Sequence, residues 1–217
     1  MNLCPFSVVE SPWWSTGNHS VRPLFEAVAA LHYDNPSAFL YDMFVNRASL
    51  KTVLSVRGKD KRTEVIYLAS HGNENDIGPD AANAISRVEA RNCLISANGT
   101  GQIKGLFLGT CLTGNSSVAK FFLENPKTSL DWFAGYRHSV DWIDGTAIDM
   151  IFFSKLADLY VKNKKKKRGK LSARKMAHTA ASNLVKLVPG AYSTYGFNIF
   201  FHEKHKLTSM FQEQPSA

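Results

Sequence analysis

The chain has few cysteines and no long apolar run. These shortages argue against a disulfide-bonded secreted protein and against a membrane-spanning one. Three cysteines among 217 residues, Cys4, Cys93 and Cys111, form no even framework of the kind found in disulfide-bonded secreted domains. No window approaches the roughly 18 consecutive apolar residues of a transmembrane helix. The N-terminus has no basic stretch, and Pro5 and Pro12 interrupt any apolar segment, so no secretory signal is expected. These absences predict a soluble, cytoplasmic protein that does not associate with membranes.

The chain also lacks the usual signatures of nucleic-acid and metal binding. Its formal charge of +8 arises from 26 basic and 18 acidic residues, and much of the excess lies in one lysine-rich run at 162–170. Such a run is typical of a solvated loop between helices. No zinc-finger spacing, recognition-helix pattern or aromatic-interleaved RNA motif is present. We therefore expect no nucleic acid, metal or cofactor, although a weak attraction to acidic partners stays open.

The distribution of apolar residues predicts one α/β domain over residues 1–206 and a disordered tail over 207–217. Hydrophobic residues make up 44% of the chain and charged residues 20%, as in ordinary globular proteins. Short apolar runs alternate with stretches of helical spacing. Strands are expected at 3–9, 38–45, 64–69, 103–108, 130–136 and 197–201, and helices at 21–31, 47–56, 86–95, 116–123, 144–161 and 171–187. This order favours a three-layer fold with a mostly parallel central sheet of about six strands flanked by helices.

Two of the expected strands end at reactive side chains. The segment Ile-Tyr-Leu-Ala-Ser leads to His71-Gly72, and Leu-Phe-Leu-Gly-Thr leads to Cys111. Reactive groups of open α/β sheets gather beyond the carboxyl ends of the strands, so neighbouring strands would bring these residues together although they are 40 positions apart. A thiol and an imidazole in contact form a nucleophile and its base. Backbone amides near Gly72 and Cys111 would then form an oxyanion hole.

Cysteine, histidine and tryptophan residues also have structural roles, which are alternatives to a catalytic one. A cysteine in an apolar segment is usually a small buried hydrophobe, which is the interpretation we favour for Cys4 and Cys93. His71 alone is as easily structural as catalytic, and a metal site with Cys111 lacks any paired-ligand spacing. The occurrence of both residues at strand ends favours catalysis. The adjacent Trp13 and Trp14 more often cover a core than form a docking or stacking site.

These two segments resemble the signature blocks of caspase-like peptidases, the clan of caspases, metacaspases, clostripain, separase and legumain. The block Leu-Gly-Thr-Cys-Leu-Thr-Gly, which ends at Gly114, is most similar to that of the bacterial CHAT-type branch. It departs from eukaryotic caspases, in which Gln-Ala precedes the cysteine. The resemblance extends over roughly residues 65–202 and is strong only at the two blocks. It implies a caspase-type fold and a Cys-His dyad without a cofactor.

The resemblance also implies how such a protein would act. His71 would serve as general base and acid, and Cys111 would form an acyl-enzyme with a protein substrate. The side chain before the cleaved bond (P1) is usually charged in this clan. Asp141 and Asp144 would suit a basic P1 residue and Arg137 an acidic one; we favour the basic one. Asp141 and Asp144 also suit helix capping and a first helical turn.

The resemblance also suggests how the protein would be regulated, and two other functions compete with the peptidase. A domain of this size has no evident sensor, so activation by a regulatory protein or ligand is expected, in a bacterial stress or defence pathway by analogy. The main alternative is a catalytically silent caspase-like adaptor that binds a protein partner or signalling ligand. A thiol hydrolase on an unrelated α/β scaffold is disfavoured, because Thr113 stands where a nucleophile elbow has its second glycine.

Overall fold

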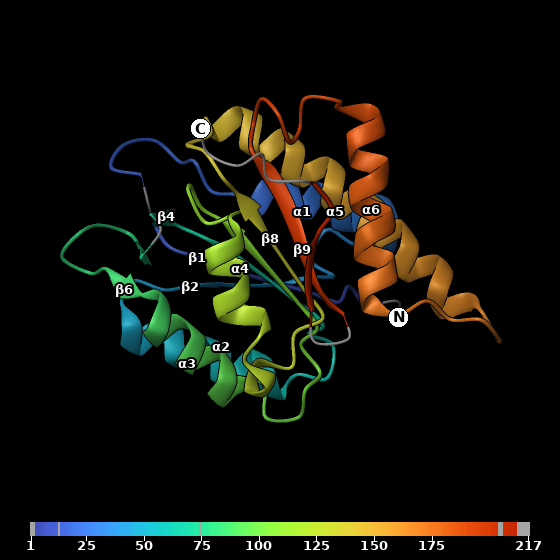
Figure 1. The fold of residues 1–217 in the computed structure, drawn as a ribbon, viewed down its shortest axis with the longest axis horizontal. Helices are drawn as coiled ribbons and strands as arrows, with labels where there is room; N and C mark the ends of the chain where they lie inside the picture. The colour runs from blue at the N-terminus through green and yellow to red at the C-terminus, as the bar shows by residue number, and fades with distance from the viewer. Residues whose placement is uncertain (1–2, 13, 74, 204–205, 212–217) are drawn as a thin grey trace.

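A seven-stranded central sheet organises the chain. The computed structural model describes residues 3–12, 14–73, 75–203 and 206–211 (Figure 1). From one edge to the other, the strands are β10 (Lys206–Ser209), β9 (Phe197–Glu203), β8 (Trp132–Tyr136), β7 (Gly105–Gly109), β3 (Val65–Ala69), β1 (Phe6–Glu10) and β2 (Leu40–Met43). The five strands from β8 to β2 run parallel to one another. Strand β9 is antiparallel to β8, and β10 is antiparallel to β9.

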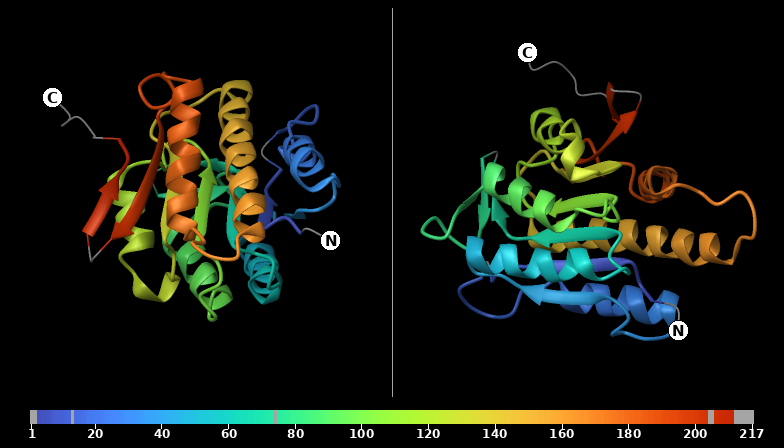
Figure 2. Two further views of the ribbon diagram at one scale, coloured as in Figure 1. Left: turned by 90° about the vertical axis from the view of Figure 1, so that its right-hand side faces the viewer. Right: turned by 90° about the horizontal axis from the view of Figure 1, so that it is seen from below.

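Helices cover both faces of this sheet and give the protein three layers (Figure 2). One face carries α1 (Arg22–Tyr33), α5 (Trp142–Lys165) and α6 (Ala173–Leu187). The opposite face carries α2 (Arg47–Lys59), α3 (Arg87–Ala97) and α4 (Ser116–Leu123). A short 3-10 turn, Pro126–Thr128, follows α4. Each face has its own apolar core, so the sheet is buried on both sides, as parallel sheets generally are.

The uninterrupted apolar run of β3 shows why this strand lies at the centre. All five of its residues are buried. Successive side chains of a strand point to opposite faces. Tyr67 therefore packs in the core beneath α1 and α5, whereas Ile66 and Leu68 pack in the core beneath α2, α3 and α4.

A second, three-stranded antiparallel sheet follows β3. It consists of β4 (His71–Gly72), β5 (Asp76–Gly78) and β6 (Ile85–Ser86). Its last strand leads directly into α3, where Ser86 caps the helix and Glu89 completes a capping box. The helix expected at 86–95 is thus α3, and a short strand precedes it.

Three sequence expectations need correction. The helix expected at 47–56 continues through Lys59, so Gly58 lies inside α2, where a Cβ atom would collide with the Ala97 carbonyl of α3. The run at 162–170 is not all loop, because α5 continues through Lys165. The tail was expected to be disordered from residue 207, but Lys206–Ser209 form β10 by pairing with β9. Residues 212–217 lie outside the described residues, as does Trp13.

None of the helices in the described part of the chain has the length and apolar content to cross a membrane.

Candidate active site

The ends of two paired strands bring His71 and Cys111 to the same edge of the sheet. Strands β3 and β7 are parallel neighbours, and their last residues, Ala69 and Gly109, are partners in the register. His71 and Cys111 each follow two residues later in the chain. His71 is exposed and Cys111 is partly buried, whereas Cys4 and Cys93 are buried. Of the three thiols, Cys111 alone is thus accessible at the carboxyl edge of the sheet.

A strained and hydrogen-bonded turn holds Cys111 in place. The next residue, Leu112, has a φ of 61°, in the left-handed region that costs a non-glycine residue about 1–3 kcal/mol. The hydroxyl of Thr113 accepts a hydrogen bond from Thr110 Oγ1 at 3.0 Å and donates one to the Thr110 carbonyl at 3.1 Å. The side-chain nitrogen of Asn115 donates to the Leu112 carbonyl at 3.1 Å, and its side-chain oxygen caps α4. These bonds offset the cost of the turn that carries Cys111.

The segment that carries His71 packs directly against this turn. A Cβ atom at Gly72 would lie 2.9 Å from Thr110 Cβ, so only glycine allows the two segments to approach so closely. The amide of Asn73 donates to the Asp76 carbonyl at 2.9 Å. Because amides alternate in direction along an antiparallel strand, the Gly72 amide points away from β5. The His71 segment therefore lies beside Cys111 with an amide that is not used in its own small sheet.

A cavity of about 200 Å³ opens beside these two residues. The ends of β3 and β7 and the start of α5 form its walls. His71 and Cys111 both line it, as do the carboxyl-bearing residues Asp141 and Asp149. No lysine or arginine is among the described residues that line it. The cavity thus combines a thiol, an imidazole and two acidic side chains.

Asp149 is the most unusual member of this set, because it is only 2% exposed. Its carboxylate accepts hydrogen bonds from the hydroxyls of Tyr67 at 2.6 Å and Tyr136 at 2.5 Å. Tyr67 comes from β3 and reaches Asp149 by lying across Gly109, where a Cβ atom would overlap its ring. Burial raises the pKa of the Asp149 carboxyl to about 7, although the hydrogen bonds from Tyr136 and Tyr67 act in the opposite direction.

Asp149 is expected to make the folded state less stable as the pH rises. Its pKa of about 7 in the folded protein exceeds the ordinary value of 3.8. The folded state therefore binds this proton more tightly than the unfolded state. The contribution of the protonated Asp149 carboxyl to the free energy of unfolding is complete below pH ~4 and is lost as the pH rises towards ~7. The slope contributed by one such group approaches about 1.4 kcal/mol per pH unit. Urea denaturation of the wild type and of Asp149→Asn between pH 4.5 and 8 should show a difference in unfolding free energy that shifts in favour of the variant as the pH rises. Parallel curves would contradict it.

The other predicted site residues occupy different places. Asp141 lines the cavity, but its carboxylate also caps α5 by accepting a hydrogen bond from the Ile143 amide at 2.8 Å. Asp144 lies in the first turn of α5 and does not line the cavity. Arg137 is also outside the lining; it donates to the Tyr192 hydroxyl at 2.5 Å and stacks on that ring. The helix-capping alternative thus describes Asp141, and neither Asp144 nor Arg137 contributes to the cavity.

Asp149 was not among the residues predicted from the sequence, although the sequence carries a signal for it. It lies between Ile148 and Phe152 on the buried face of α5, where every other residue is apolar or glycine. An acidic residue within an apolar helical stripe needs a hydrogen-bonding partner or a function. That interruption was the available indication.

Comparison with known proteins adds no family assignment. No protein-family model matches the chain, and no curated protein sequence matches it.

Proposed function

We propose that this protein is a caspase-like cysteine endopeptidase in which Cys111 and His71 form the catalytic dyad. The observation that carries the proposal is the placement of both residues two positions beyond a paired strand end, on the lining of one cavity. A thiol and an imidazole on the lining of one cavity are the nucleophile and the base that a thiol protease requires. The resemblance of the two segments to the caspase-like signature blocks, which rests on these same residues, points in the same direction.

The chemistry follows from these two side chains. His71 accepts the thiol proton as Cys111 Sγ attacks the carbonyl carbon of the scissile peptide bond. The amides of Gly72 and Cys111 donate to the oxyanion that forms. The C–N bond then breaks, His71 passes its proton to the departing amine, and an acyl-enzyme remains. Water, deprotonated by His71, attacks the thioester; the carboxylic product leaves and the thiol is restored.

The cavity favours a basic P1 residue. Two carboxyl-bearing residues, Asp141 and Asp149, line it, and no cationic lysine or arginine among the described lining residues would attract an acidic side chain. A volume of about 200 Å³ suits one long side chain. We therefore assign the P1 preference to Arg or Lys, with Asp149 rather than Asp144 as the recognising carboxylate. Activation by a partner or ligand in a bacterial stress or defence response is proposed from the resemblance alone.

Labelling with peptide acyloxymethyl ketones tests this function. Probes that carry Arg, Lys, Asp or Glu at P1 are incubated with the wild type and with His71→Ala, and the modified residue is located by mass spectrometry. We expect Arg and Lys probes to modify Cys111 and the His71→Ala substitution to abolish this. Cys93, which is 6% exposed, is the internal control. If Cys111 reacts no faster than Cys93 with every probe, the peptidase proposal fails in favour of a silent adaptor.

A further inference from the structure

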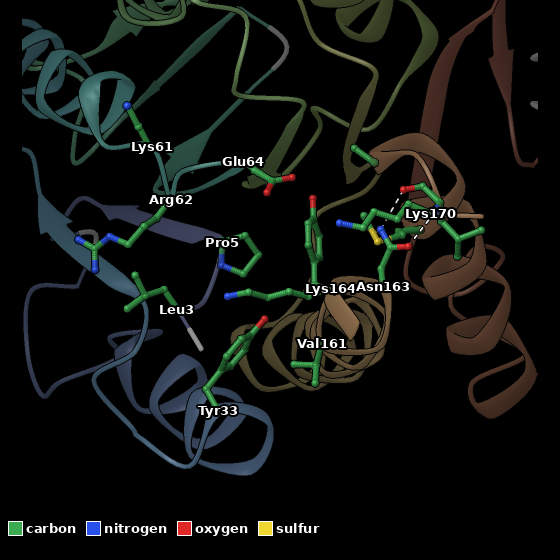
Figure 3. A pocket seen from close by; sticks show the side chains of 14 residues that line it. Leu3, Pro5, Tyr33, Lys61, Arg62, Glu64, Val161, Asn163, Lys164 and Lys170 are labelled. Carbon is green, nitrogen blue, oxygen red and sulfur yellow. Dashed lines mark hydrogen bonds between the residues drawn. The ribbon is translucent and has the colours of Figure 1, made fainter. Parts of the chain in front are cut away.

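A second cavity, of about 460 Å³, opens at the opposite end of the central sheet (Figure 3). Its lining includes Pro5 and Glu64, which directly precede β1 and β3, whereas His71 follows the far end of β3. The C-terminal part of α5 forms another wall. None of the described residues lines both this cavity and the proposed active site, and the peptidase chemistry makes no use of this cavity.

Basic side chains dominate the charge of this second cavity. Lys61, Lys164 and Lys170 line it, and Figure 3 shows the Lys164 side chain lying across it between Pro5 and Tyr33. Arg62 also lines it but is paired with Asp60 at 2.6 Å. Among the lining residues that the structure describes, Glu64 is the acidic one. The lysine-rich run at 162–170 thus contributes two of its amino groups to a concave site.

The remaining walls supply different chemistry. Tyr33, Leu3 and Val161 provide aromatic and apolar surface. The Glu64 carboxyl is partly buried and lies beside the hydroxyl of Tyr160. A carboxylate in this position accepts hydrogen bonds from N–H groups. The cavity therefore combines cations for an anion, an apolar lining that includes the mostly buried Tyr33, and a carboxylate that can accept hydrogen bonds.

We propose that this cavity binds a small organic phosphate of the nucleotide class. Its phosphates would contact Lys164 and Lys170, its base would pack on Tyr33, and a base N–H group would donate to Glu64. Lysine is a common phosphate ligand that acts as a point charge. The volume lies within the range of about 300–1,000 Å³ typical of small-molecule sites, which favours one nucleotide over a nucleic-acid strand.

Calorimetric titration with ATP, ADP, AMP, adenosine and pyrophosphate tests this site without any measurement of peptidase activity. The variant Lys164→Ala/Lys170→Ala removes two lysines that line the cavity. The matched control, Lys166→Ala/Lys167→Ala, removes the same charge from the same run at positions outside the lining. All four side chains are exposed, so thermal unfolding of the two variants should match. We expect nucleotides to bind the wild type, the first variant to weaken this at least about tenfold, and the control to change it less than about twofold.

Three results would overturn this proposal. Absence of nucleotide binding at millimolar concentration would exclude the site. An equal loss in both double variants would assign the attraction to the charge of the run as a whole, as expected for a nucleic acid. Pyrophosphate binding as tightly as ADP would exclude recognition of the base. None of these results bears on labelling of Cys111, so the two proposals fail separately.

Discussion

Cys111→Ala and His71→Ala are each expected to lower kcat/KM for a peptide with arginine at P1 by about 10³–10⁴-fold, and the double variant to lose no more than the worse single variant. The reason is that the nucleophile and its base act as one unit: once the thiol is absent, the imidazole has no proton to accept. Both residues line the same cavity, and the Gly72–Thr110 contact fixes their segments against each other. Rates with a fluorogenic peptide below KM give the comparison directly.

The control for these single and double variants is Cys93→Ala, which removes a thiol buried in the core beneath α2, α3 and α4. It should leave kcat/KM within about twofold of the wild type, because Cys93 does not line the cavity. Losses that multiply in the double variant would show that the two residues act independently. The dyad would then be wrong even if each residue mattered alone.

Asp149→Asn is expected to lower kcat/KM for a peptide with arginine at P1 by about 10²–10³-fold. It should change kcat/KM far less for a matched peptide with citrulline at P1. Citrulline has nearly the shape of arginine but no charge, so the ratio of the two rates isolates the ion pair. The preference for arginine should also increase between pH 6 and 8, because burial raises the pKa of the Asp149 carboxyl to about 7. The substitution should abolish this increase.

Two matched variants separate Asp149 from its neighbours. Asp144→Asn removes the same charge from the same helix outside the cavity and should leave the arginine-to-citrulline ratio unchanged. Asp141→Asn keeps a side chain that caps helices well, so it tests the second carboxylate of the cavity without loss of α5. An unchanged ratio in Asp149→Asn would assign recognition elsewhere.

The sequence was informative where local pattern determines structure. The apolar runs that lead to His71 and Cys111 could be recognised as buried strands, because continuous runs of this length belong to sheets covered on both faces. The pairing of Ala69 with Gly109 could not be derived, since it depends on how the intervening segment crosses the sheet. The general α/β layering followed from the alternation of elements. The antiparallel pairing of β9 with β8 and of β10 with β9 at one edge of the sheet did not.

The errors had tertiary causes. Helix α2 continues beyond the expected end at residue 56 and includes Gly58, a poor helix former whose missing side chain allows the close approach of the Ala97 carbonyl. The polar segment Lys206–Ser209 is ordered by hydrogen bonds to β9 rather than by its own composition. Asp149 was overlooked because its partners, Tyr67 and Tyr136, come from strands distant in sequence. The deciding contacts range from a local hairpin, in which Lys206 pairs with Glu203, to the bond between Tyr67 and Asp149, which are 82 positions apart.

Helix α5 carries residues of both cavities, and this limits how its length can change in evolution. Asp149 lines the cavity beside Cys111, and Val161 lines the cavity at the other end of the sheet. One inserted or deleted residue between them would rotate one end of the helix relative to the other by about 100° and shift it by about 1.5 Å. Either lining would then face away from its cavity. Homologous chains that retain both cavities should therefore differ in this stretch by substitution and not by length.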